Sequence, residues 1–175
     1  MLSTGVSEVE IVVTEMMKGG TALNAAHLTK IADAVGRVFS VQTDEVAILS
    51  VTDDGKFLRF RVPEQLQSVG RIPLTSNTSL AVRTARDKRP EIVNHFNIAP
   101  HASVFEGVRI KKERSDPIQK IMSAPIAVNA KVIGVLQVSR KAKTARGARD
   151  FSPSDLRQLV SITALVAPAL PLCEG

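Results

Sequence analysis

Hydrophobic residues recur at helical spacing near the start of the chain and predict two consecutive helices. The first follows a Ser7–Glu10 capping box, in which serine and glutamate three positions apart satisfy free backbone groups of the first turn. Its apolar stripe consists of Val9, Val12, Val13, Met16 and Met17. Gly19 and Gly20 end this helix, and a second helix is expected over about residues 22–39.

Two short runs further along the chain predict a β-hairpin. Residues 46–51 are apolar and residues 57–62 alternate, and Asp53-Asp54-Gly55 between them is a strong turn signal. Such alternation is typical of a strand with one buried and one exposed face. The residues expected on the buried face are Leu58, Phe60 and Val62, and those expected on the exposed face are Arg59 and Arg61.

The middle of the chain is less regular. A short helix is expected over about residues 77–85, followed by a short strand at residues 91–93. From Asn94 to Lys120 the pattern is weak, with one piece of helical character near residues 104–112. Because loops of this length in compact domains usually serve function or mobility, this excursion is a candidate lid over a site.

The last third of the chain predicts a second hairpin and a final helix. Strands are expected at residues 125–128 and 132–139, and the second is apolar enough to be buried on both faces. Gly134 inside this strand indicates the close approach of another segment. Ser152 is the expected N-cap of the final helix.

This order of elements predicts an α/β fold of the α+β type, with a central antiparallel sheet of about five to six strands flanked by helices. We expect residues 1–20 to form a helical extension and residues 21–175 to form a single domain. The total of 175 residues is long enough for one sizeable core.

Composition narrows the function classes. A single cysteine, Cys173, excludes an internal disulfide and a Cys-rich metal site. The formal net charge is +6, but aromatic residues are only 3%, and the basic residues near 111–114 and 140–149 have no aromatic interleaving. We therefore expect no nucleic-acid partner. No signal-peptide pattern or long apolar run is present, which predicts a cytoplasmic protein without a membrane partner.

Five short motifs resemble the GAF domain family and cover nearly the whole chain after Gly20. They are Gly70-Arg-Ile-Pro-Leu74, Arg89-Pro-Glu-Ile-Val93, Ser123-Ala-Pro-Ile126, Val132-Ile-Gly-Val-Leu136 and Phe151-Ser-Pro-Ser-Asp-Leu156. The resemblance implies a sensor of small molecules, since most members of that family have no chemistry of their own. We therefore expect a regulatory signal-transduction domain that is not an enzyme and has no catalytic residue.

Particular branches of the family fit this chain poorly. The resemblance places the cyclic-nucleotide signature at Arg140-Lys141, Phe151 and Asp155-Leu156, where the first and last of these residues depart from it. We expect no tight cyclic-nucleotide binding, and instead a Lys141–Asp155 ion pair that ties the last strand to the last helix. Cys173 lies too near the end for the bilin attachment of other members, and one cysteine cannot run a disulfide cycle.

A small molecule of unassigned identity is expected to bind between the sheet and the Asn94–Ser123 excursion. The walls expected from the strands are Ile48 or Ser50, and Phe60. The residues expected from the excursion are His95, Phe96, His101, Val104, Phe105 and Arg109. The two histidines there lack a neighbouring carboxylate and a strict ligand spacing, so no metal is expected, and no cofactor is assigned.

Binding is expected to order the excursion and to act through the terminal helices, which would form a homodimer or contact a regulatory protein. The apolar stripe of the first helix supports dimerisation. One alternative is a ligand-free dimerisation or interaction module with the same fold. A second alternative is a nucleic-acid-binding regulator that uses its basic loops.

Overall fold

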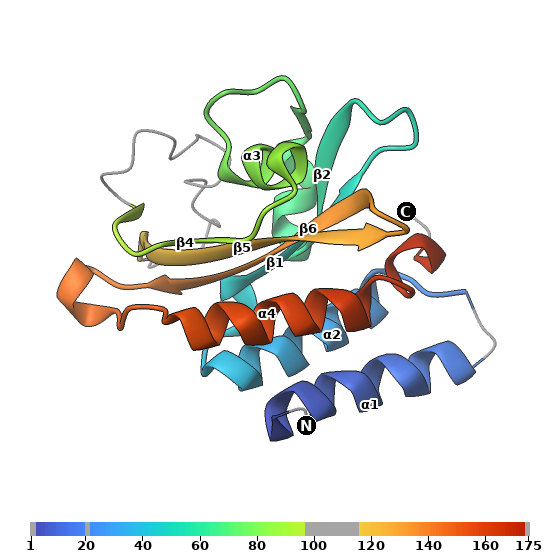
Figure 1. The fold of residues 1–175 in the computed structure, drawn as a ribbon, viewed down its shortest axis with the longest axis horizontal. Coiled ribbons are helices and arrows are strands. Elements are labelled where there is room, and N and C mark those ends of the chain that lie inside the picture. Colours follow the sequence, from blue (N-terminus) through green and yellow to red (C-terminus); the bar gives the residue numbers. More distant parts are fainter. Residues whose placement is uncertain (1–2, 20–21, 97–115, 174–175) are drawn as a thin grey trace.

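A six-stranded antiparallel sheet lies between two unequal helical layers (Figure 1). The computed structural model describes residues 3–19, 22–96 and 116–173. Helices α1 (Thr4–Lys18), α2 (Ala25–Phe39) and α4 (Pro153–Val166) cover one face, and the short α3 (Leu80–Asp87) covers the other. The α+β fold expected from the sequence is confirmed.

The strand order is β3-β2-β1-β6-β5-β4, and all neighbouring strands are antiparallel. The strands are β1 (Val46–Val51), β2 (Phe57–Val62), β3 (Arg71–Pro73), β4 (Glu91–Val93), β5 (Ile118–Val128) and β6 (Lys131–Lys141). Both predicted hairpins are present as β1–β2 and β5–β6. The central pair, β1 and β6, comes from the two halves of the chain, so the sheet joins both halves.

Helix α1 belongs to the same hydrophobic core as α2 and α4. Ser3 caps it, accepting a hydrogen bond from the Val6 amide at 3.4 Å, so the helix begins before the expected Ser7–Glu10 box. The buried residues Val6, Val9 and Val13 belong to the core that also contains α2 and α4. The apolar stripe is therefore largely covered within one chain. No helix in the described part of the chain combines the length and the apolar character that crossing a bilayer requires.

Strand β5 begins at Ile118, so the irregular excursion is shorter at its end than the sequence predicted. The early part of this strand carries Gln119, Lys120 and Ser123, and these polar residues obscure the strand pattern. All three are buried. Gln119 donates from Nε2 to the Ala142 carbonyl oxygen at 2.8 Å, Lys120 Nζ lies 2.7 Å from Asp150 Oδ1, and Ser123 lies between β4 and β6. Residues 97–115, including the helical piece expected near 104–112, lie outside the described residues.

A β-bulge at Arg61 changes which face of the sheet one residue occupies. Leu49 pairs with Phe60, whereas Ile48 pairs with Val62, so Arg61 is an additional residue in β2. Phe60 faces α3, but Val62 joins the core under the helices on the opposite face. The expectation that these two residues share a face is wrong, because a bulge interrupts strand alternation. Arg61 is also buried, where an exposed side chain was expected.

Gly134 lies where two other segments approach closely, as its place in a buried strand predicted. A Cβ atom here would collide with the carbonyl oxygen of Leu49 in β1 and would lie 2.6 Å from Leu170 Cδ2. The missing side chain therefore allows the C-terminal segment to pack on the sheet. A parallel bridge between Leu23 and Cys173 ties the same segment to the start of α2.

The expected Lys141–Asp155 ion pair is not formed. Lys141 Nζ lies 3.6 Å from the carboxylate of Asp44 instead. Asp155 accepts a hydrogen bond from the Ser152 amide and belongs to the capping box of α4. The prediction failed because a carboxylate in the first turn of a helix satisfies backbone donors there.

A buried arginine fixes the corner between β6 and α4 in place of that ion pair. Arg140 donates from Nη1 to the carbonyl oxygens of Arg149 (3.0 Å) and Asp150 (3.1 Å), and from Nη2 to that of Phe39 (3.3 Å). Its guanidinium carbon lies 4.0 Å from the centre of the Phe151 ring. Arg140, one of the two residues that depart from the cyclic-nucleotide signature, thus has a structural role here.

Candidate functional site

The sheet face beneath α3 holds two separate apolar clusters. The larger cluster joins β1, β2, β3 and β6 to α3. Its buried members are Leu49, Leu58, Phe60, Ile72, Ala81, Val82, Ala85 and Val135. The smaller cluster joins β4 and β5 to the first residue of α3. Its members are Leu80, Val93, Phe96 and Ile121.

A chain of buried polar side chains accompanies these clusters on the same face. Thr84 in α3 donates from Oγ1 to the Leu80 carbonyl oxygen at 2.9 Å. Because a hydroxyl has one proton, Ser123 Oγ must then donate to Thr84 Oγ1, at 2.7 Å. Ser123 in turn accepts from Gln137 Nε2 at 3.2 Å. Each hydrogen bond in this series therefore has one direction: Gln137 donates to Ser123, Ser123 donates to Thr84, and Thr84 donates to the backbone of α3.

Register explains why these groups meet. Ser123 in β5 and Gln137 in β6 are directly opposite each other, so their side chains share a face. Both are almost fully buried, as is Thr84 above them. Hydroxyls and amides do not ionise near neutral pH, so this cluster is unsuited to moving protons.

An ion pair lies beside the polar chain. Arg83 in α3 and Glu91 in β4 are 2.7 Å apart from Nη2 to Oε1, with a second contact of 2.9 Å from Nε. Glu91 pairs with Ser123 across β4 and β5, which places the ion pair at the β4 side of the cluster. Both side chains are about one third exposed. This face therefore combines apolar walls, neutral hydrogen-bonding groups and charges nearer the solvent.

The predicted wall residues do not all meet on this face. Phe60 belongs to the larger apolar cluster and Phe96 to the smaller one, while His95 is exposed. Ser50 and Ile48 belong to the opposite face, because the residue between them, Leu49, faces α3. The structure therefore places Phe60 and Ser50 on different faces of the sheet. The remaining predicted residues, His101, Val104, Phe105 and Arg109, lie outside the described residues.

Sequence reasoning did not select Thr84, Ser123 or Gln137 as site residues. The sequence did contain one signal for this cluster, namely polar residues inside two predicted strands. A strand that is buried on both faces usually has few polar residues. Only the register of β5 against β6, and the placement of α3 above both, show that the three side chains meet.

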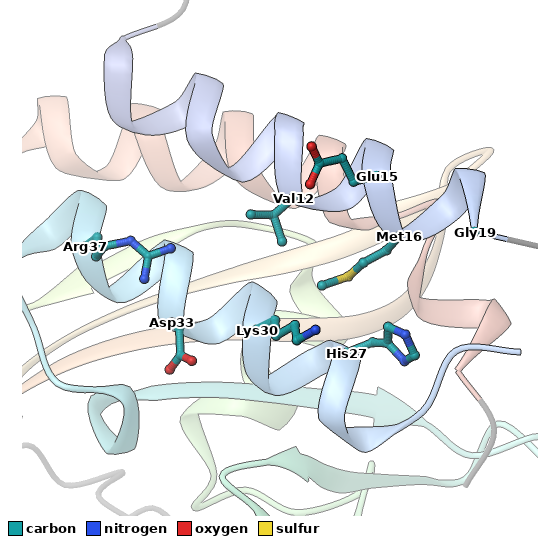
Figure 2. A pocket seen from close by; sticks show the side chains of 8 residues that line it. All are labelled: Val12, Glu15, Met16, Gly19, His27, Lys30, Asp33 and Arg37. Carbon is teal, nitrogen blue, oxygen red and sulfur yellow. The ribbon is translucent and has the colours of Figure 1, made fainter. Parts of the chain in front are cut away.

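A groove lies between α1 and α2 (Figure 2). It has a volume of about 510 Å³. Its lining residues are Val12, Glu15, Met16, Gly19, His27, Lys30, Asp33 and Arg37. Figure 2 shows Val12 and Met16 extending from α1 toward α2.

Charges of both signs line this groove, and some of them serve the helices themselves. Arg37 contacts Glu8 at 2.6 Å, and His27 Nδ1 accepts from the Asn24 amide at 3.1 Å as part of the α2 capping box. The groove therefore has no charge of one sign that would select a particular class of ligand. Within the described residues, no group of three His, Cys, Asp or Glu side chains is placed to hold a metal ion.

Comparison with known proteins identifies the protein family to which this chain belongs. The GAF domain family model matches residues 25–170. The chain resembles the GAF domain of an Acinetobacter phosphoenolpyruvate-protein phosphotransferase, with a TM-score of 0.69, 14% identity and coverage of 98% of this chain and 95% of that chain. A search of curated proteins finds no match.

Two further solved structures share the fold. The free methionine-R-sulfoxide reductase of Neisseria meningitidis has a TM-score of 0.64 and 15% identity, with coverage of 95% of this chain and 86% of that chain. The second GAF domain of DevS from Mycobacterium smegmatis has a TM-score of 0.58 and 16% identity, with coverage of 85% and 94% respectively. At such identities the likeness concerns the fold alone.

This α+β domain with an antiparallel sheet belongs to the GAF domain family, because the family model spans most of its length. Domains of this family are generally sensory or ligand-binding parts of signalling proteins. The resemblance drawn from the sequence motifs is confirmed.

Proposed function

We propose that this domain is a non-catalytic sensory module that binds a small molecule on the sheet face beneath α3. The observation that carries the proposal is the oriented hydrogen-bond chain of Gln137, Ser123 and Thr84 beside two apolar clusters. Apolar walls with a few convergent polar groups are the usual composition of a small-molecule site. Residues 97–115 would supply the remaining wall, as the sequence predicts.

Asn94 offers a route from this site to the helical layer. Its side chain makes two hydrogen bonds to the backbone of Phe151, donating from Nδ2 to the carbonyl oxygen (3.1 Å) and accepting from the amide (2.9 Å). Phe151 immediately precedes the N-cap of α4, and Phe96, two residues after Asn94, belongs to the smaller apolar cluster. A ligand that repositions this cluster would therefore bias the position of the start of α4.

Native mass spectrometry of the protein purified from its own source tests the proposal. We expect a bound mass that is lost on unfolding and is depleted in Thr84→Val, which removes the hydroxyl next to Ser123 while keeping the side-chain shape. Thr29→Val is the matched control, because Thr29 makes the same bond to the carbonyl four residues earlier, at 3.0 Å, but lies in α2. Absence of any bound mass, together with a flat thermal-shift response to a metabolite library, would contradict the proposal.

A ligand-free dimerisation module is the second candidate, and it is favoured by apolar surface on the terminal helices. Ile11 in α1 is 57% exposed and Val160 in α4 is 43% exposed. However, most of the apolar stripe of α1, from which the sequence predicts the homodimer, packs against the core of the same chain. The homodimer thus stays a prediction that depends on this smaller surface.

A further inference from the structure

The connector between β6 and α4, residues 142–151, presents three cationic side chains to the solvent (Figure 1). Lys143, Arg146 and Arg149 are exposed, and within the described residues none of them forms an ion pair with an acidic side chain. The acidic residue of the connector itself, Asp150, already lies 2.7 Å from Lys120 Nζ through Oδ1. The three charges are therefore not neutralised by the described part of the chain.

Local contacts give the connector a defined backbone. Its middle is a 3-10 turn at Ala145–Gly147, in which the Gly147 amide donates to the Thr144 carbonyl oxygen at 3.1 Å. Ala142 and Ala148 are buried, and a Cβ atom on Gly147 would lie only 3.1 Å from that of Ala142, so the connector folds closely back on itself. A backbone that is already ordered reduces the entropy that a binding partner has to overcome.

Both ends of the connector are attached to the sheet. Its first amide donates to the carbonyl oxygen of Pro117, just before β5, at 3.1 Å. At its other end, Arg140 of β6 donates to the Arg149 carbonyl oxygen, and Asn94 makes two hydrogen bonds to the backbone of Phe151. The cations are therefore carried by a segment that the sheet holds and that leads directly into α4.

Electrostatics favour negative charge beside this segment. Burial lowers the pKa of Arg140, and the positive charge of Arg149 lowers it further, while Asp155 and Glu45 act in the opposite direction. Both carboxylates already serve the backbone, since Asp155 caps α4 and Glu45 accepts from an amide of β6 at 2.6 Å. Negative groups on a partner would offset the mutual repulsion of the cations.

The composition of the connector favours carboxylates over nucleic acids and lipids. Surfaces that bind single-stranded nucleic acids combine cations with aromatic side chains on which bases stack. Phe151 is the one aromatic residue of the connector, and it is buried with its ring against Arg140. It is also the one large apolar residue there, so no such side chain is available for insertion into lipid.

We propose that Lys143, Arg146 and Arg149 form a docking surface for an acidic segment of a partner protein. Exposed ion pairs are individually weak, so this surface suits a reversible contact whose specificity comes from charge. A partner bound here would contact the segment that begins α4. The proposal requires no ligand beneath α3.

Fluorescence anisotropy of labelled octaglutamate tests this surface. We expect saturable binding that weakens as sodium chloride is added, because salt screens exposed charges. In the triple variant Lys143→Gln, Arg146→Gln and Arg149→Gln, the affinity should fall about tenfold, since three weak pairs are lost together. In NMR spectra of the unmodified domain, the backbone amide signals of residues 143–149 should shift with the same saturation curve.

A second triple variant, Lys30→Gln, Lys56→Gln and Arg89→Gln, is the control. It removes the same net charge from exposed positions on other elements, and its affinity should stay within about twofold of the unmodified domain. No saturable binding of octaglutamate, or equal losses in the two triple variants, would overturn the proposal. Tighter binding of an oligothymidylate of equal charge, lost in the connector variant, would overturn it in favour of a nucleic-acid partner. The Thr84→Val experiment reports on a different site, so the two proposals can fail separately.

Discussion

At the scale of single residues, a few side chains decide how distant parts of this domain meet. Gly134 admits Leu170 to the sheet, Arg140 collects three carbonyl oxygens, and Ser123 links two strands to α3. Each of these residues contacts segments that are distant in the sequence. Their substitution should therefore cost more than their small size or ordinary propensity suggests.

Replacing Gly134 with alanine should destabilise the domain by about 1–3 kcal/mol, the usual cost of overpacking a core. The new methyl group would meet the Leu49 carbonyl oxygen, which belongs to a central strand and has little room to move. Chemical denaturation measures the change. Gly5→Ala, in the first turn of α1, is the control, because the nearest atom to its Cβ would be in the Val38 side chain, at 3.2 Å, and the nearest backbone atom would be at 3.5 Å. Equal stability of Gly134→Ala and the unmodified domain would contradict the close approach.

At the scale of elements, the helical layer and the sheet share one hydrophobic core, and further contacts fix the two ends of α4. Arg140 and Asn94 fix the start of α4, while Leu170 and Cys173 fix the segment after its end. Helix α4 is thus held at both ends by contacts with other elements. A change in the sheet that alters either junction would therefore move one end of α4.

Arg140→Lys should destabilise the domain by about 1–3 kcal/mol, because a single ammonium group cannot reach all the carbonyl oxygens that the guanidinium satisfies. The first contacts to be lost should be those to Arg149 and Asp150, which lie just before α4. Hydrogen exchange should therefore rise at the N-terminus of α4 more than in β1. Arg149→Lys, which changes an exposed side chain next to the same junction, should leave both measurements unchanged.

At the scale of the whole molecule, the terminal helices lie on one face of the sheet and α3, above the proposed ligand site, lies on the other (Figure 1). A sensor with this arrangement can report a ligand on one face through contacts made on the other. Two predictions concern the complete domain, namely its oligomeric state and its choice of ligand.

The domain should form a homodimer through α1 and α4. Ile11→Asp should shift the sedimentation of the domain toward the monomer, because it places a charge on exposed apolar surface. Asn77→Asp adds the same charge to an exposed position before α3 and should have no effect. Val13→Asp is unsuitable, since Val13 is buried and its substitution would unfold the core. An unmodified domain that sediments as a monomer at micromolar concentration would contradict the dimer.

Cyclic AMP and cyclic GMP should not bind with submicromolar affinity. Arg140 and Leu156 replace two residues of the signature, and the three residues that match it lie in structural contacts. Lys141 faces Asp44, Asp155 caps α4, and the Phe151 ring lies against Arg140. Isothermal titration calorimetry measures the affinity. Submicromolar binding of either nucleotide would show that the family signature tolerates these changes.

The sequence by itself determined the elements and the family. Apolar runs, the alternation within residues 57–62 and the turn signals between the strands predicted both hairpins, and the motifs from Gly70 to Leu156 indicated a GAF domain. These features depend on neighbours along the chain, so a local pattern suffices to predict them. Gly134 was interpretable for the same reason, because a glycine in a buried strand indicates close approach wherever the strand lies.

Only the tertiary structure decided which residues share a site. The bulge at Arg61 moved Val62 to the helical face, and strand alternation separated Ser50 from Phe60. The meeting of Ser123 with Gln137 depends on the register of two strands, and their contact with α3 depends on packing. Register and packing arise from contacts between residues far apart in the chain. The pattern along one segment therefore predicts that it is a strand, while its partners determine what its side chains can bind.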